Sequence, residues 1–183
     1  MNKPYLICHM ASSIDGRIIP EDWGDKLGEY SKLYESCHNS FNGQAWMVGR
    51  VTMEKDFTEG KSPDPVKPSH PIERKAFVGN PSADSFAIAV DSKGKLGWDE
   101  NEIDGDHVIE FLSESVSDGY LQYLQNKKIS YVFSGKDDLD FSIGLSQLHD
   151  VSFEVADYLP EKGARMLSVI DVKKLEHDVV VEV

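Results

Sequence analysis

One stretch of the sequence decides the fold: Trp46-Met47-Val48-Gly49-Arg50-Val51-Thr52. Its first three residues are apolar and belong to a short buried strand that we predict over residues 45–48. Gly49 is expected to form a turn, and residues 50–57 have the apolar spacing of a helix. A strand that passes almost at once into a helix is typical of α/β proteins, in which the chain crosses over the sheet between parallel strands.

The alternation of strands and helices continues on both sides of this stretch. Apolar runs predict strands over residues 5–11, 86–90, 108–112 and 129–133, and helical spacing predicts helices over 27–41, 118–126 and 139–148. Three further strands are predicted in succession, over 151–158, 166–175 and 178–183. We therefore expect an α/β fold with a mainly parallel central sheet and antiparallel strands at its C-terminal edge.

The chain length favours one domain. With 183 residues, it is in the ordinary range for a single globular core, so we expect one domain over residues 1–183. Residues 60–81 contain Pro63, Pro65, Pro68, Pro71 and Pro81, five of the eight prolines. Because proline breaks both helices and strands, this segment is predicted to be an ordered arm or a mobile flap.

Charge and composition exclude several classes of partner. The formal net charge of −13 opposes association with nucleic acid or anionic membrane. No apolar run approaches the roughly 20 residues of a membrane-spanning helix, and the first residues lack the apolar run of a signal peptide. With only two cysteines, a disulfide framework is not expected. These features predict a cytoplasmic protein, in which an anionic cofactor would need a local cluster of basic groups.

Ligands of open α/β sheets bind where the strands end, so the turns after the strands are the candidate sites. Gly49, Arg50 and Thr52 follow the second predicted strand at the start of a helix. The free N–H groups there, the guanidinium fork and the hydroxyl suit a phosphate. The alternative is a glycine turn beside a solvated arginine.

Two other turns are weaker candidates by themselves. Ser92 and Lys93 close the strand over 86–90 and could hold a further phosphate, such as the one that distinguishes NADP from NAD; a solvated β-turn is the alternative. Ser13, Asp15 and Gly16 follow the first strand. They could cover the reactive ring of a cofactor, with Asp15 or a serine near the substrate, or they could form a tight loop and nothing more.

Two Cys-His dipeptides, Cys8-His9 and Cys37-His38, raise the possibility of a metal site. Adjacent residues on a strand point to opposite faces, so Cys8 and His9 are poorly placed to bind one ion. No CxxC or HxxxH spacing accompanies them. We therefore predict no metal site.

Several motifs occur in a fixed order along residues 3–148. They are Lys3–Ile18, Val48–Glu54, Ala89–Leu96, Leu112–Glu114, Tyr120–Leu121 and Ser130–Gly135. Together they resemble the dihydrofolate-reductase-like proteins related to the reductase domain of the bacterial riboflavin-biosynthesis deaminase/reductase. The resemblance implies a three-layer α/β/α fold of that type.

The resemblance also implies an activity. Members of the family transfer hydride from NADPH, typically to the ribosyl carbon of a phosphorylated aminopyrimidine, and a pterin-like substrate is an alternative. Carried over by position, Gly49, Arg50 and Thr52 would hold the phosphates of NADPH, and Ser92 and Lys93 would lie near its adenosine end. Ser13 and Gly16 would form the loop beside the nicotinamide, with Asp15 as catalytic proton donor or substrate anchor. A homodimer is also implied.

The chain departs from the family at one point. After the helix that matches residues 139–148, the family has a buried strand ending in a Gly-Gly turn and then a helix, whereas this chain contains no Gly-Gly pair. Either this is a shortened relative that binds a nucleotide weakly or not at all, or its last strands rearrange to replace the missing one. A non-catalytic protein that binds a nucleotide or a partner is therefore the alternative to a reductase.

Overall fold

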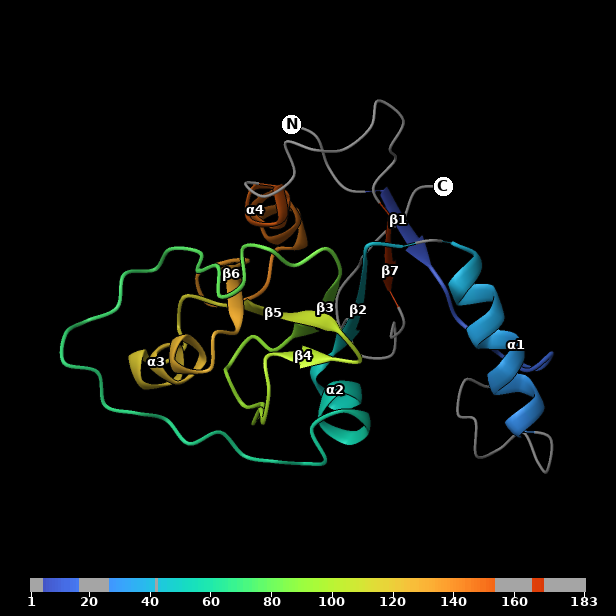
Figure 1. Cartoon of the computed structure of the whole chain (residues 1–183), viewed down its shortest axis with the longest axis horizontal. Helices are drawn as coiled ribbons and strands as arrows, with labels where there is room; N and C mark the ends of the chain where they lie inside the picture. Colours follow the sequence, from blue (N-terminus) through green and yellow to red (C-terminus); the bar gives the residue numbers. More distant parts are fainter. Residues whose placement is uncertain (1–4, 17–26, 42, 154–165, 170–183) are drawn as a thin grey trace.

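The computed structural model describes residues 5–16, 27–41, 43–153 and 166–169 (Figure 1). Its strands are β1 (Tyr5–Cys8), β2 (Ala45–Gly49), β3 (Phe86–Val90), β4 (Glu102–Ile103), β5 (Asp106–Leu112), β6 (Ser130–Phe133) and β7 (Met166–Val169). Its helices are α1 (Leu27–Ser40), α2 (Arg50–Asp56), α3 (Asp118–Asn126) and α4 (Phe141–Phe153).

The strands form one sheet in the order β1-β7-β2-β3-β5, with β4 and β6 both paired to β5. All of these pairs are parallel except β4 with β5. In the centre, Met47 of β2 lies opposite Ile88 of β3, which lies opposite Ile109 of β5. The predicted α/β fold with a mainly parallel sheet is confirmed.

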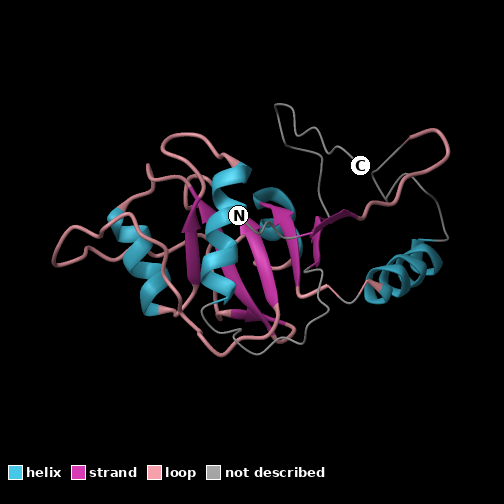
Figure 2. Ribbon diagram, turned by 90° about the horizontal axis from the view of Figure 1, so that it is seen from above, coloured by secondary structure: helices cyan, strands magenta, loops and turns pink. Residues whose placement is uncertain are grey.

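The two faces of the sheet carry separate apolar clusters. Val48 and Ala89 pack on one face with Met53 of α2 and Leu121 of α3. The residues before them, Met47 and Ile88, point to the other face, where the cluster includes Leu145 and Leu148 of α4. Successive residues of a strand point to opposite faces, so helices on both sides are needed to bury β2, β3 and β5. Figure 2 shows the sheet between these helices.

The prediction of antiparallel strands at the C-terminal edge is wrong where the structure describes that region. β7 runs parallel to both of its neighbours and lies inside the sheet, between β1 and β2. The chain reaches β7 from β6 by way of α4, and a connection through a helix returns the chain in the same direction. Consecutive strands without an intervening helix would instead have formed antiparallel pairs.

Other boundaries differ from the predicted ones. Residues 151–153, predicted as the start of a strand, are the last turn of α4. The first strand ends at Cys8 instead of residue 11, and β4 was not predicted. The predicted strand segments over 154–158, 170–175 and 178–183 lie outside the described residues.

The proline-rich segment is joined to α3 and β6. Arg74 of this arm contacts Asp118 through Nη1 at 2.5 Å and donates to the main-chain oxygen of Val116 at 2.8 Å. Phe77 and Tyr131 exchange main-chain hydrogen bonds of 3.0 Å in both directions. The arm therefore adds one antiparallel bridge to the outer edge of β6.

Helix α1 lies apart from the other helices, beyond β1 (Figures 1 and 2). Its apolar spacing predicts a buried face, yet Leu33 is 68% exposed and Tyr30 is 40% exposed. Tyr34 and Phe41 are half-buried. Tyr34 of α1 contacts the segment after β1 through the ring of His9, as described below.

The close packing of α4 on the sheet predicts the effect of a single methyl group. A Cβ added at Gly144 would lie 2.6 Å from both the Phe111 ring and the Ser134 Cβ, whereas one added at Gly28 of α1 would meet nothing within 4 Å. Overpacking costs about 1–3 kcal/mol, and alanine favours a helix over glycine by about 1 kcal/mol. We expect urea denaturation to show a net loss of stability for Gly144→Ala and none for Gly28→Ala. Equal stability of the two variants would contradict this packing.

Candidate functional site

The three turns singled out in the sequence lie at one edge of the sheet. Strands β1, β2 and β3 are parallel, counting through β7, so their carboxyl ends point the same way. With neighbouring strands about 4.8 Å apart, the three steps from β1 to β3 span about 14 Å. Only an extended ligand could contact all three turns.

The loop after β1 is a tight turn, as its Asp-Gly sequence predicts. The main-chain N–H of Gly16 donates to the Ser13 carbonyl oxygen at 2.9 Å, and Gly16 has a φ of +79°, which glycine adopts without strain. The Ser13 hydroxyl donates to Oδ1 of Asp15 at 2.5 Å. The turn thus orients the exposed Asp15 carboxylate through a neighbouring hydroxyl.

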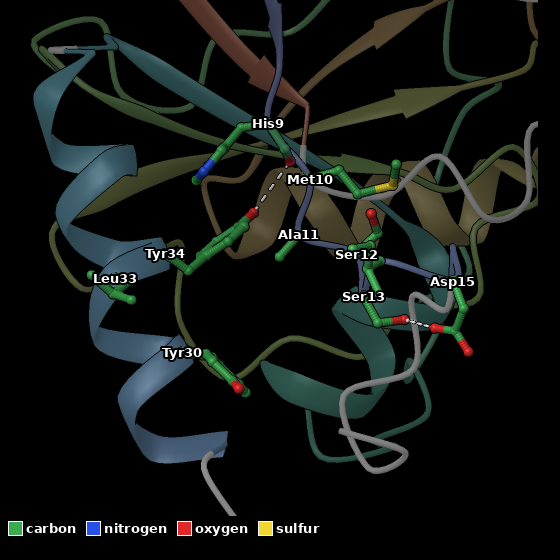
Figure 3. Close-up of a pocket in the computed structure, with 10 residues that line it drawn as sticks. His9, Met10, Ala11, Ser12, Ser13, Asp15, Tyr30, Leu33 and Tyr34 are labelled. Atoms are coloured by element: carbon green, nitrogen blue, oxygen red, sulfur yellow. Dashed lines mark hydrogen bonds between the residues drawn. The ribbon is translucent and has the colours of Figure 1, made fainter. Parts of the chain in front are cut away.

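A cavity of about 640 Å³ lies between this loop and α1 (Figure 3). Ser13 and Asp15 line it from the loop, and Tyr30 and Tyr34 line it from α1. The exposed side chain of Leu33 also lines it. The size and the mixture of aromatic and polar walls suit a small organic molecule.

His9 forms the upper wall of this cavity. Its ring stacks on Tyr34 with centroids 4.0 Å apart and an interplanar angle of 15°, and it meets the Phe41 ring edge-on at 5.2 Å. The Tyr34 hydroxyl donates to the main-chain oxygen of His9 at 3.3 Å. Nδ1 of His9 is buried and has no hydrogen-bond partner among the described residues.

The titration of these groups follows from their surroundings. Burial, and secondly the nearby His38, lower the pKa of His9, so the imidazole is neutral at neutral pH. Burial raises the pKa of Tyr34 to about 12, with smaller contributions from Cys8 and Cys37. The stack therefore joins two uncharged rings.

The turn after β2 differs from its prediction. Gly49 is not in a turn: it ends β2 and precedes α2 with extended backbone angles, φ −71° and ψ 159°. Arg50 forms an ion pair with Glu54, one turn further along α2, and its side chain is 31% exposed. Thr52 is half-buried. The guanidinium has five N–H donors, so this pair leaves capacity for a second anion.

The turn after β3 forms as predicted. The N–H of Gly94 donates to the Asp91 carbonyl oxygen at 3.3 Å, and Gly94 has a φ of +65°. The Lys93 ammonium donates to the Ser115 hydroxyl at 3.2 Å and to the Asp137 main-chain oxygen at 3.1 Å. Both acceptors are neutral, so these bonds do not cancel the charge of Lys93.

Sequence reasoning missed the serines that complete this turn. Ser113 donates through its hydroxyl to the main-chain oxygen of Ser92 at 2.8 Å, and its Oγ lies 2.7 Å from that of Ser115. Both serines follow β5, so the available signal was their place after a predicted strand. The sequence also did not predict that His9, Tyr30 and Tyr34 line a cavity. The Cys-His pair suggests only a metal ligand, and the spacing of the tyrosines suggests only a buried helix face.

No set of three or more His, Cys, Asp or Glu residues in the described ranges could hold a metal ion. Cys8 and Cys37 are exposed free thiols. Among the same residues, no helix combines the length and the apolar character that crossing a membrane requires. Comparison with known proteins found no matching family model and no matching curated protein.

The His9 stack predicts a dependence of stability on acid pH. Because its folded pKa is lowered, His9 contributes stability above its ordinary pKa of 6.5, and this contribution is lost as the pH falls through the folded value. His9→Phe keeps a ring against Tyr34 but cannot bind a proton. We expect its melting temperature to fall less than that of the wild type between about pH 7.5 and about pH 5.5.

The exposed His70 provides the control for this experiment. His70→Gln should lose stability in acid to the same extent as the wild type. Parallel melting curves for the wild type and His9→Phe would contradict a role for the stack.

Proposed function

We propose that this protein is an NADPH-dependent reductase of the riboflavin-biosynthesis type, with a dihydrofolate-reductase-like fold, acting on a small pyrimidine-ribosyl or pterin-like substrate. The observation that supports this best is that three motif-bearing segments follow the carboxyl ends of parallel strands of one sheet, and that the first of them lines a cavity of about 640 Å³. The proposal rests on the sequence resemblance for its chemistry and on this arrangement for its site.

The cofactor is assigned to the junction between β2 and α2 and to the turn after β3. Gly49, Arg50 and Thr52 would hold the pyrophosphate of NADPH, and Ser92 and Lys93 would contact its adenosine end. The residues present fit an anion, because the Lys93 ammonium has neutral acceptors in the described part of the chain and the Arg50 guanidinium has donors beyond its bond to Glu54. NADPH supplies the hydride when it is bound. The protein neutralises its phosphates and fixes its position.

The substrate is assigned to the cavity beside the first turn. The rings of Tyr30 and Tyr34 offer flat walls to a heteroaromatic ring, and Ser13 and Gly16 belong to the turn next to the nicotinamide position. The Asp15 carboxylate accepts a hydrogen bond from Ser13 and is exposed, so we assign it to anchoring polar groups of the substrate.

The missing Gly-Gly turn has two explanations, and the position of β7 favours one of them. A strand that follows α4 does lie inside the sheet, parallel to β1 and β2. The late strand Met166–Val169 thus occupies an interior position, as expected if the last strands replace a lost one. In a shortened chain without such a replacement, β1 and β2 would each lack the neighbour that β7 provides.

One observation favours the alternative of a non-catalytic relative. Arg50 is paired with Glu54 of its own helix, and this pair competes with any phosphate. A protein that retained the cleft but not the cofactor would keep such a pair. A lack of NADPH binding would exclude the reductase, whereas a non-catalytic relative that still binds the nucleotide would differ from a reductase in failing to oxidise NADPH.

Titration with NADPH tests the proposal directly. At a free concentration a hundred times its Kd, NADPH should stabilise the protein by about 2.7 kcal/mol, which is measured as a rise in melting temperature. Arg50→Ala should weaken NADPH and NADH equally, by roughly tenfold or more, since both contain the pyrophosphate. Glu54→Gln is the matched variant: it removes the competing charge and should strengthen binding. If the wild type shows no shift with NADPH, the reductase assignment fails.

The role of Asp15 predicts a separate kinetic result. Asp15→Asn keeps the size of the side chain but removes its charge, so an anchoring role should raise KM for the substrate with little change in kcat. The Kd for NADPH should stay the same. A loss of roughly a hundredfold in kcat at constant KM would instead identify Asp15 as the proton donor.

A further inference from the structure

A carboxyl group to which no basic side chain of the described residues is paired lies in the core between β5 and α3. Glu110 is 0% exposed. Its Oε1 lies in hydrogen-bond contact with the Trp98 indole nitrogen and 2.7 Å from the Tyr120 hydroxyl. Its Oε2 is buried and has no hydrogen-bond partner among the described residues. Nothing in the proposed reaction uses this group.

The groups that face Glu110 are neutral or acidic. Tyr120 and Tyr123 face it from α3, and Trp98 faces it from the segment before β4. At the end of β3 is Asp91, itself 1% exposed. No lysine or arginine of the described residues forms an ion pair with Glu110. Burial, and secondly the nearby Asp91, raise the pKa of Glu110 well above its usual value.

The hydrogen-bond geometry around Tyr120 also favours a protonated Glu110. The Tyr120 hydroxyl lies within hydrogen-bond distance of two acceptors, Oε1 of Glu110 at 2.7 Å and the Leu96 main-chain oxygen at 3.0 Å. A phenol has only one hydrogen to donate. If Glu110 carries a proton on Oε1, it donates to Tyr120, and Tyr120 donates to Leu96. Both contacts are then complete hydrogen bonds.

This chain of hydrogen bonds ends at the turn after β3. Leu96 also donates its main-chain N–H to Oδ2 of Asp91 at 2.8 Å, and the same carboxylate oxygen accepts from the Lys95 N–H at 2.5 Å, just after the turn that carries Ser92 and Lys93. A Cβ at Gly94 would lie 2.5 Å from the Tyr120 ring, so the turn rests directly on that ring. Tyr120 therefore connects Glu110 with this turn.

We propose that Glu110 is a positioning residue that carries a proton in the native protein, and that this proton holds the turn of Ser92 and Lys93 in place. When Glu110 ionises, its charged oxygen competes for the single Tyr120 hydrogen, and Leu96 loses its donor. The new charge also faces Asp91. The importance of this turn for cofactor binding rests on the proposed function, but the protonation of Glu110 does not.

The protonated Glu110 predicts that the stability of the protein falls as the pH rises. A carboxyl whose folded pKa is raised contributes stability fully below its ordinary pKa of 4.5, and this stability is lost as the pH rises through the folded value. Glu110→Gln cannot ionise and should lack that loss. The exposed Glu100 provides the matched control, Glu100→Gln.

Infrared spectroscopy of the full chain tests for the proton. The wild type and Glu100→Gln should both show the carbonyl stretching band of a protonated carboxylic acid at neutral pH, and Glu110→Gln should lack it. Absence of the band from the wild type, or its persistence in Glu110→Gln, overturns the proposal. Thermal melts from about pH 5 to about pH 9 should show a smaller loss of stability for Glu110→Gln than for the other two proteins.

Amide resonances of Ser92 and Lys93 test the coupling to the turn. In the wild type they should shift with the same midpoint at which the infrared band disappears, and in Glu110→Gln this transition should be absent. Resonances that stay constant while the band is lost would overturn the positioning role. Neither readout involves NADPH, so a failure to bind NADPH would remove the proposed function and leave this inference intact.

Discussion

A parallel sheet has to be covered on both faces, and the rest of the described structure depends on that constraint. Each parallel pair requires a connection that crosses the sheet, and these crossovers supply the covering helices. The same constraint puts every strand end, and hence every following turn, at one edge. The sequence reflects this constraint, because neighbouring apolar residues of a strand belong to different clusters: Met47 and Ile88 to one, Val48 and Ala89 to the other. Glu110 is notable because it occupies such a covered position with a titratable group.

The sequence predicts a helix or strand correctly where the residues that begin and end it are neighbours in the chain. The strand Phe86–Val90 and the helix Asp118–Asn126 begin and end at the predicted residues. The helix has a local start signal, since the Ser117 hydroxyl accepts a hydrogen bond from the Tyr120 N–H. The direction of β7 could not be predicted in this way, because it depends on which strands it joins after α4. The two residues of β4 were too few to produce a pattern.

The candidate site was predictable in its location but not in its contacts. Asp15, Arg50 and Lys93 all lie in the segments that follow β1, β2 and β3, as the sequence predicts. The pairing of Arg50 with Glu54 was also available from the sequence, as a spacing of four residues on a helix. By contrast, His9 and Tyr34 meet across 25 residues, and Lys93 reaches Ser115 across 22. Such contacts depend on the assembled sheet and leave no periodic trace.

The bridge between Phe77 and Tyr131 has a consequence for folding during synthesis. An uncovered outer strand offers its row of amides and carbonyls to other chains, and this promotes aggregation of incomplete molecules. The arm precedes β6 in the sequence, so it has already left the ribosome when the strand it covers emerges. Tyr131 can pair with Phe77 only after β6 has emerged, and the early presence of the arm would shorten the time during which nascent chains could associate through this edge.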